Sequence, residues 1–327
     1  MGISLKQKAV FFRQLATMSE ASVPLLKSIA ILKKQLRGTE FKIIAEDLEA
    51  SIAKGASISS VISKYKNVFT PFEIQLIKSG EESGKLPARL INIANHLENL
   101  YNIRLKIIAS LLYPFLLINA GILIPPVIEA ATKGVAFYFK AVLINICVVY
   151  GGALAIYFIY KLLKSFPPTD AFLARLSLLT PVAGKMNYRL SLSGYLLNLA
   201  ELNEAGINIT SANELAADTV SNIIIRKKLY KISGYIKEGL PISEALLRTK
   251  LFDDMSIGMI MAGEESGNIS ASLKKVAEFL QKEAENDLTK IMVILPALIF
   301  LVIAVYFGYV IITFYQGYFN NIFKVLE

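Results

Sequence analysis

Apolar positions along the chain follow two patterns, and the change from one to the other occurs twice. Over residues 1–100 and 185–285, apolar side chains recur at intervals of three and four, the period of an amphipathic helix. Strand-like alternation is absent from both regions. Each region runs, without a helix breaker, into a long apolar stretch. The pattern therefore predicts two compact helical bundles, each with a last helix that continues into a hydrophobic segment.

Three charge-free runs are long enough to cross a lipid bilayer. They cover residues 107–128, 141–160 and 291–323. A helix needs about 20 apolar residues to span the hydrocarbon core, so all three qualify. The link from Glu129 to Lys140 is too short for a domain and predicts a tight hairpin. We expect an all-α, polytopic membrane protein with two helical-bundle domains and three transmembrane helices.

The two bundles are copies of one module. The pentapeptide Gly-Glu-Glu-Ser-Gly occurs at Gly80–Gly84 and again at Gly263–Gly267, each time at nearly the same distance ahead of an apolar run. The match extends well beyond the pentapeptides, pairing Ala21 with Ala205, Val23 with Ile207, Gly55 with Gly239, Ile58 with Ile242, Phe69 with Phe252 and Leu90 with Leu273. The offset changes by one residue partway along, as a single loop deletion would leave. The function must therefore use two copies of a module at a membrane.

Basic residues beside the spans predict the orientation. One side carries more of them (Arg104, Lys106, Lys161, Lys164, Arg175 and Lys290) than the other (Lys133, Lys140 and Lys324). The positive-inside rule places the first group, the N-terminus and both modules in the cytoplasm, and the C-terminus outside. The expected parts are a first cytoplasmic domain (1–105), a transmembrane helix (106–128), an external loop (129–140), a second transmembrane helix (141–162), a second cytoplasmic domain (163–289), a third transmembrane helix (290–315) and an external tail (316–327).

The sequence predicts several helix starts within the modules. Thr70–Glu73 reads as an N-cap, a proline at the first helical position and a capping-box glutamate. Asp253 takes the place of the N-cap in the second copy. Short helices are expected to begin near Ser57 and Pro241. The glycines of the two pentapeptides are expected to allow left-handed backbone geometry in a turn between helices, at Gly80, Gly84, Gly263 and Gly267.

The paired acids of the pentapeptides, Glu81, Glu82, Glu264 and Glu265, have three interpretations. The first is structural: the carboxylates lie near the N-terminus of the next helix, where its dipole favours them. The second is a docking point for a basic surface on a partner. The third is a weak divalent-cation site, which is disfavoured because too few oxygen ligands are visible nearby.

The sequence gives little support for nucleotide binding, catalysis or a metal site. A phosphate loop needs four residues between its glycines and Ser or Thr after the lysine, which the first pentapeptide with Lys85 does not provide. With one histidine, His96, and one cysteine, Cys147, the chain offers no catalytic triad, disulfide or cysteine-based metal site. The N-terminus does not read as a signal peptide. We expect no enzyme activity, cofactor or metal.

The net charge of +9 implies an anionic partner. Basic residues are not interleaved with aromatics in a nucleic-acid motif, so anionic lipids are the better reading and nucleic acid is not expected. The cluster from Arg226 to Lys231 is either a solvated helix face or a contact for lipid headgroups or an acidic partner.

The spans carry no charge but contain polar and helix-breaking residues, notably Pro114, Asn119, Asn145 and Pro296. A transporter typically places a carboxylate or base inside the membrane. Because none is present, the two asparagines are interpreted as interhelical hydrogen-bonding groups and not as a substrate path.

The chain resembles the type II secretion system protein F family, which includes the platform proteins of type IV pili. Phe12–Ala16 and Ala21–Leu25 are similar to the family's opening helix, both pentapeptides to its Gly-Glu-x-Ser-Gly turn, and Pro296 to its third-span proline. Ser22 departs from the family by replacing a glycine that Gly206 retains. The short N-terminus looks more like the pilus branch.

The resemblance implies a non-enzymatic platform in the bacterial inner membrane. Its partners would be a cytoplasmic hexameric assembly ATPase, pilin or pseudopilin transmembrane helices, other inner-membrane assembly proteins and further copies of itself. The paired acids would orient the ATPase-facing surface. Type IV pilus assembly is the favoured function, with a type II secretion or competence pseudopilus as the alternative within the family. A transporter subunit and a membrane-anchored enzyme are the alternatives outside it.

Overall fold

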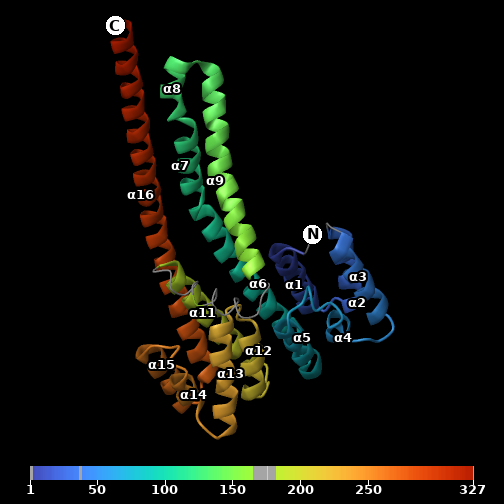
Figure 1. Ribbon diagram of the computed structural model, residues 1–327. Coiled ribbons are helices and arrows are strands. Elements are labelled where there is room, and N and C mark those ends of the chain that lie inside the picture. The colour runs from blue at the N-terminus through green and yellow to red at the C-terminus, as the bar shows by residue number, and fades with distance from the viewer. Residues whose placement is uncertain (1–2, 37–38, 165–174, 176–181, 327) are drawn as a thin grey trace. The chain divides into compact units, whose positions relative to one another are not determined.

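The computed structural model describes residues 3–36, 39–164, 175 and 182–326, and in this part of the chain it contains helices and no strands (Figure 1). The described residues form two compact units. Unit 1 combines residues 1–105 with 186–284, and unit 2 combines residues 106–185 with 285–327. The all-α class expected from the sequence is confirmed. Much of the predicted start of the second domain, at 165–174 and 176–181, lies outside the described residues.

Unit 1 contains the two modules. The first is built from α1 (Leu5–Glu20), α2 (Leu25–Gln35), α3 (Thr39–Ile52), α4 (Ile58–Ile62), α5 (Pro71–Ser83) and the first part of α6 (Leu86–Ser110). The second is built from α11 (Ala183–Glu204), α12 (Ile209–Asp218), α13 (Ile223–Lys237), α14 (Ile242–Arg248), α15 (Asp254–Glu265) and the first part of α16 (Ile269–Leu326). Each module thus has the same succession of six helices.

The internal repeat extends to the geometry of individual turns. After α1, the Ser22 N–H donates to Ser19 O and the Ser22 φ is 57°; after α11, Gly206 N–H donates to Asn203 O and its φ is 79°. The predicted caps are also present. Thr70 and Glu73 form a capping box at α5, and Asp253 caps α15. Ser57 and Pro241 immediately precede α4 and α14, as expected.

Each module has its own buried core. In the first, Phe11 contacts Phe41 and Phe12 contacts Phe69, with ring centroids 5.0 and 6.0 Å apart. A buried ion pair lies beside them, with Lys8 Nζ 2.7 Å from Glu73 Oε1. In the second, a fully buried Tyr195 donates a hydrogen bond to Asn213 at 2.5 Å.

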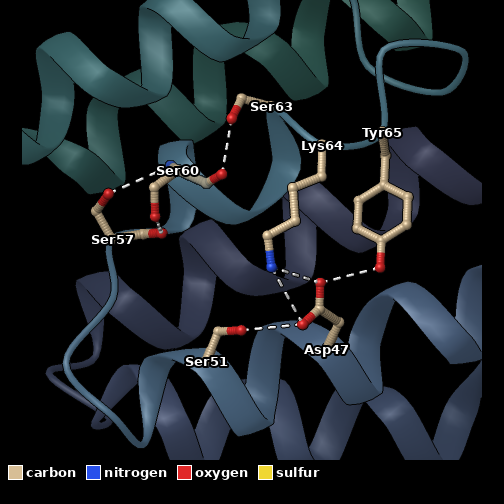
Figure 2. A network of polar contacts seen from close by, with 7 residues as sticks. All are labelled: Asp47, Ser51, Ser57, Ser60, Ser63, Lys64 and Tyr65. Carbon is tan, nitrogen blue, oxygen red and sulfur yellow. Dashed lines mark hydrogen bonds and ion pairs between the residues drawn. The ribbon is translucent and has the colours of Figure 1, made fainter.

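A smaller polar network ties α3 to the segment that follows α4 (Figure 2). The Asp47 carboxylate accepts hydrogen bonds from the Ser51 hydroxyl at 2.9 Å, the Tyr65 hydroxyl at 3.0 Å and the Lys64 ammonium at 3.2 Å. These contacts fix the chain as it leaves the short helix. They compensate for a helix that is too short to hold its position by its own hydrogen bonds.

Unit 2 contains the apolar part of the chain. Its complete helices are α7 (Leu112–Leu123), α8 (Pro126–Lys133) and α9 (Val135–Lys164), and it includes the ends of α6 and α16. By length and composition, three helical segments can cross a membrane: Leu86–Ile128, Val135–Leu163 and Ile269–Phe319. The prediction of three transmembrane helices is confirmed at this level.

The last helix of each module continues into its apolar segment, without interruption in the second module and with a break at one residue, Leu111, in the first. α16 is helical from Ile269 to Leu326, with Pro296 inside it. α6 instead ends at Ser110 and α7 begins at Leu112. Pro114 explains this difference, because proline has no N–H to donate and its ring conflicts with the carbonyl one turn earlier. The predicted external link is mostly helical, with a sharp turn at Gly134, whose φ is 87°.

Candidate functional site

The first glutamate of each acidic turn caps a short helix within its own module. Glu81 accepts hydrogen bonds from the backbone N–H groups of Ile58 and Ser59 and from the Ser59 hydroxyl, at 2.5, 3.2 and 2.5 Å. These donors lie at the start of α4. The first N–H groups of a helix have no partner inside the helix, and its dipole attracts a negative charge there. Glu81 therefore satisfies donors that α4 leaves open.

The second module repeats this arrangement. Glu264 accepts from Ile242 N, Ser243 N and the Ser243 hydroxyl at 2.7, 3.0 and 2.5 Å, at the start of α14. The structural interpretation correctly predicted that a carboxylate binds the N-terminus of a helix, but it predicted the wrong helix. We expected the carboxylates at the helix that follows each turn, whereas these two hold the short helix that precedes α5 or α15. Sequence spacing could not reveal this contact, because it depends on how α5 folds back on α4.

The second glutamate of each turn lies on the surface. Glu82 and Glu265 are both exposed, and Glu82 lies 3.9 Å from Lys78 on the same helix. An exposed pair at this spacing contributes little to stability. Of the four acids proposed from the sequence, Glu82 and Glu265 are the two whose charges face outward.

The pentapeptide glycines have two different roles. Gly84 and Gly267 carry the expected left-handed backbone, with φ of 69° and 71°. Gly80 and Gly263 instead lie inside α5 and α15. A Cβ on Gly263 would lie 2.0 Å from Ser272 Oγ, and one on Gly80 would lie 3.0 Å from Leu86 Cα. These two glycines allow close helix packing and do not form the turn.

A cleft opens between α7, α9 and α16 in unit 2. Its volume is about 540 Å³, and its walls are apolar apart from Asn145 and Tyr306. Asn145 on α9 donates to the Tyr306 hydroxyl on α16 at 3.1 Å, and Tyr150 on α9 donates to Asn119 on α7 at 3.0 Å. Both asparagines therefore make hydrogen bonds between helices. Such bonds hold apolar helices together where water is absent.

Gly121 is a cleft residue that the sequence analysis did not single out. A Cβ at this position would lie 2.7 Å from Ile303 Cγ1, so only glycine permits the approach of α7 to α16. Small residues at helix contacts in membranes are the signal that could have found it. Pro114 and Pro296 are buried within the same unit.

Neither site resembles a catalytic or metal centre. Within the described residues, no group of three or more His, Cys, Asp and Glu side chains is arranged to hold a metal ion. Glu81 and Glu264, the best-placed carboxylates, are occupied by helix N–H groups. The described residues offer a pair of matching helical modules and an apolar cleft with two polar groups, an arrangement suited to binding helices.

Comparison with known proteins gives a consistent result. The sequence model of the family described as Type II secretion system (T2SS), protein F, matches residues 11–130 and 195–317. The type IV pilus assembly protein PilC of Thermus thermophilus is 26% identical, over 99% of this chain and 84% of its own length. PilC of Pseudomonas aeruginosa is 26% identical, over 95% of this chain and 89% of its own length. The type II secretion system protein F of Vibrio cholerae is 24% identical, over 91% of this chain and 78% of its own length.

Proposed function

Because the chain belongs to the type II secretion system protein F family, we propose that it is an inner-membrane platform protein for type IV pilus assembly. The observation that carries this proposal is the near-complete match to two proteins named for pilus assembly, over 99% and 95% of the chain. The double family match also supports the duplicated module, because its two parts fall on the two repeats.

The platform acts by binding and not by catalysis. Its two modules lie in the cytoplasm and receive the assembly ATPase, while its apolar helices contact pilin transmembrane helices. α16 supports this coupling, because one unbroken helix begins in the second module and continues through the third span. A force on the module would therefore be carried along the helix to the membrane.

Glu82 and Glu265 are the proposed ATPase contacts. Their exposed carboxylates suit a basic partner surface, whereas Glu81 and Glu264 serve the module itself. The double variant Glu82→Lys/Glu265→Lys should reduce co-purification of the ATPase at least several-fold. The matched control is Glu238→Lys, which reverses another exposed charge. Unchanged ATPase recovery with the double variant would contradict this contact.

The apolar cleft is the proposed contact for a pilin helix. Val302 lines the cleft, whereas Val305 lies on the same helix outside the cleft lining. Val302→Phe should fill the cleft and reduce surface pili, while Val305→Phe should leave piliation unchanged. Equal effects of the two variants, at equal protein levels, would show that the cleft has no special role.

A deletion strain tests the overall function. Loss of the gene should remove surface pili and leave pilin in the inner membrane, and the wild-type gene should restore assembly. The similarity to type II secretion system protein F makes secretion the second candidate. Intact pili with loss of exoprotein secretion would favour that candidate and reject the first.

A further inference from the structure

Within unit 1, the first module receives a turn of the second. The Ser79 hydroxyl donates to Ala205 O at 2.8 Å, and Arg89 Nη2 donates to Glu204 O at 2.8 Å. We call the α5–α6 surface the receiving face, and the turn that follows α11 the docked turn. α5 also packs against α12, as Figure 1 shows. Two different surfaces of one module type thus meet in this contact.

Each module has both kinds of surface. A contact between the receiving face of one module and the turn of the other therefore leaves one surface of each kind without a partner inside the chain. The second module has its own receiving face on α15–α16, where Ala262 takes the place of Ser79. The first module has its own turn after α1, where Glu20 and Ala21 take the places of Glu204 and Ala205. All three of these residues are exposed. The chain therefore presents an unoccupied receiving face and an undocked turn.

We propose that copies of this chain associate head to tail, with the turn after α1 of one copy bound to the α15–α16 receiving face of the next. This contact would bring together between chains the same two surfaces that meet within a chain, with Ala262 and Ser272 in the places of the donors Ser79 and Arg89. The partner is a second copy of the same protein. The inference depends on the repeat and not on whether the assembled fibre is a pilus or a pseudopilus.

The turn after α1 has the backbone shape that the contact requires. Ala21 N–H donates to Thr17 O at 3.1 Å, as Ala205 N–H donates to Glu201 O at 3.0 Å. The following residue, Ser22, adopts the left-handed conformation of its counterpart. The Ala21 carbonyl is thus placed on its module in the same way as the Ala205 carbonyl.

Charge also complements across the proposed contact. Inside the chain, Asn99 and Gln281 exchange hydrogen bonds at 3.0 and 3.2 Å. Between copies, Lys282 takes the place of Asn99 and Glu98 takes the place of Gln281. These two residues carry opposite charges. Lys282 is exposed, and the Glu98 side chain, which pairs with Arg13 in its own module, is 43% exposed. Opposite charges at matching positions favour this pairing over contact between two identical faces.

A further polar contact and an apolar stripe add to the match. Lys275, exposed on α16, stands where the first module has Asn92, whose amide donates to Glu201 in the last turn of α11. In the proposed contact it would meet Thr17, the counterpart of Glu201, and would lie near Glu20, which follows one turn later on α1. α15 exposes Met255, Gly258 and Ala262 at helical spacing, on the helix that corresponds to α5. Leu26 of α2, 40% exposed, is an apolar side chain available to cover this stripe.

Cysteine cross-linking in membranes tests the contact with the full-length chain. In a Cys147→Ser background, Ala21→Cys and Ala262→Cys are placed on separate, differently tagged chains that are expressed together. Oxidation with copper phenanthroline should give a dimer carrying both tags. Each variant expressed alone should give no dimer, because the contact joins two different surfaces. The control chain, Ser79→Cys/Ala205→Cys, should cross-link within one monomer.

Two outcomes would overturn the proposal. One is no dimer with both tags while the control chain cross-links. The other is an equal dimer yield from Ala21→Cys alone, which would indicate a symmetric contact. Charge reversal gives an independent measurement: Glu20→Lys on the Ala21→Cys chain should lower the dimer yield several-fold, and Lys275→Glu on the other chain should restore it. Failure of ATPase binding or pilus assembly would leave these results unaffected, so the two proposals fail separately.

Discussion

At the scale of single residues, Ser22 shows what a departure from the repeat costs. Its φ of 57° is a left-handed conformation, which costs an L-residue about 1–2 kcal/mol and which glycine adopts freely. Ser22→Gly should therefore raise the thermal unfolding midpoint of the full-length protein in detergent. Gly206→Ser is the matched reverse change and should lower it. A lower midpoint for Ser22→Gly would show that the serine side chain contributes more than the backbone costs.

Asp47 makes a pH-dependent contribution to stability. Hydrogen bonds from Ser51 and Tyr65, with the nearby Lys64 ammonium, lower the pKa of the Asp47 carboxyl below its ordinary value of 3.8 (Figure 2). The folded state thus favours the charged form. The resulting stability is complete above the unfolded-state pKa and is lost as the pH falls through the lower folded-state pKa.

Asp47→Asn measures this contribution. It should lower the free energy of unfolding near pH 7 by less than about 1 kcal/mol, because the site is open to solvent and salt. The difference from wild type should be smaller at pH 3 than at pH 7, because the unfolded-state carboxyl takes up a proton below its ordinary pKa of 3.8. A difference that persists unchanged at both pH values would assign the effect to shape and not to charge.

The buried pair Lys8–Glu73 is absent from the second module. The corresponding residues there are Leu192 and Ser256, both buried. Glu73→Ser alone should destabilise the first module by about 3–5 kcal/mol, because the Lys8 ammonium would remain buried without its partner. Lys8→Leu/Glu73→Ser, which copies the second module, should recover much of that loss. Equal destabilisation by the single and double variants in thermal unfolding would contradict this reasoning.

At the scale of helices, the two glutamates of one acidic turn are expected to behave differently. Glu81→Gln removes the charge that holds the start of α4 and should cost about 1–3 kcal/mol of unfolding free energy. Glu82→Gln changes an exposed neighbour and should be nearly neutral. Limited proteolysis near α4 should detect the first change and not the second. Equal protection in both variants would remove Glu81 from this structural role.

Helix starts were predictable from sequence where the signal is local. The capping box at Thr70 and Glu73 and the cap at Asp253 needed only neighbouring residues. The role of Glu81 was not predictable in this way, because its donors lie more than 20 residues earlier, at Ile58 and Ser59. Gly263 was misplaced for the same reason, since its constraint is Ser272 on another helix.

At the scale of the whole molecule, the repeat and the apolar runs were sufficient to predict the all-α class and the three candidate spans. The asymmetric contact between modules was not predictable, because Asn92 and Lys275 occupy equivalent positions and nothing in the sequence shows which one meets Glu201. Duplication followed by divergence explains this. One receiving face became an internal contact, while the other kept different residues.

The orientation of the chain in the membrane is the last expectation at this scale. Basic residues beside the spans place both modules in the cytoplasm and the turn at Gly134 outside. In a Cys147→Ser background, Ala136→Cys should react with a membrane-impermeant maleimide in cells with a permeabilised outer membrane. Lys54→Cys, on the exposed turn after α3, should react only after the inner membrane is opened. The reverse pattern would invert the topology and place both modules, with Glu82 and Glu265, out of reach of a cytoplasmic ATPase.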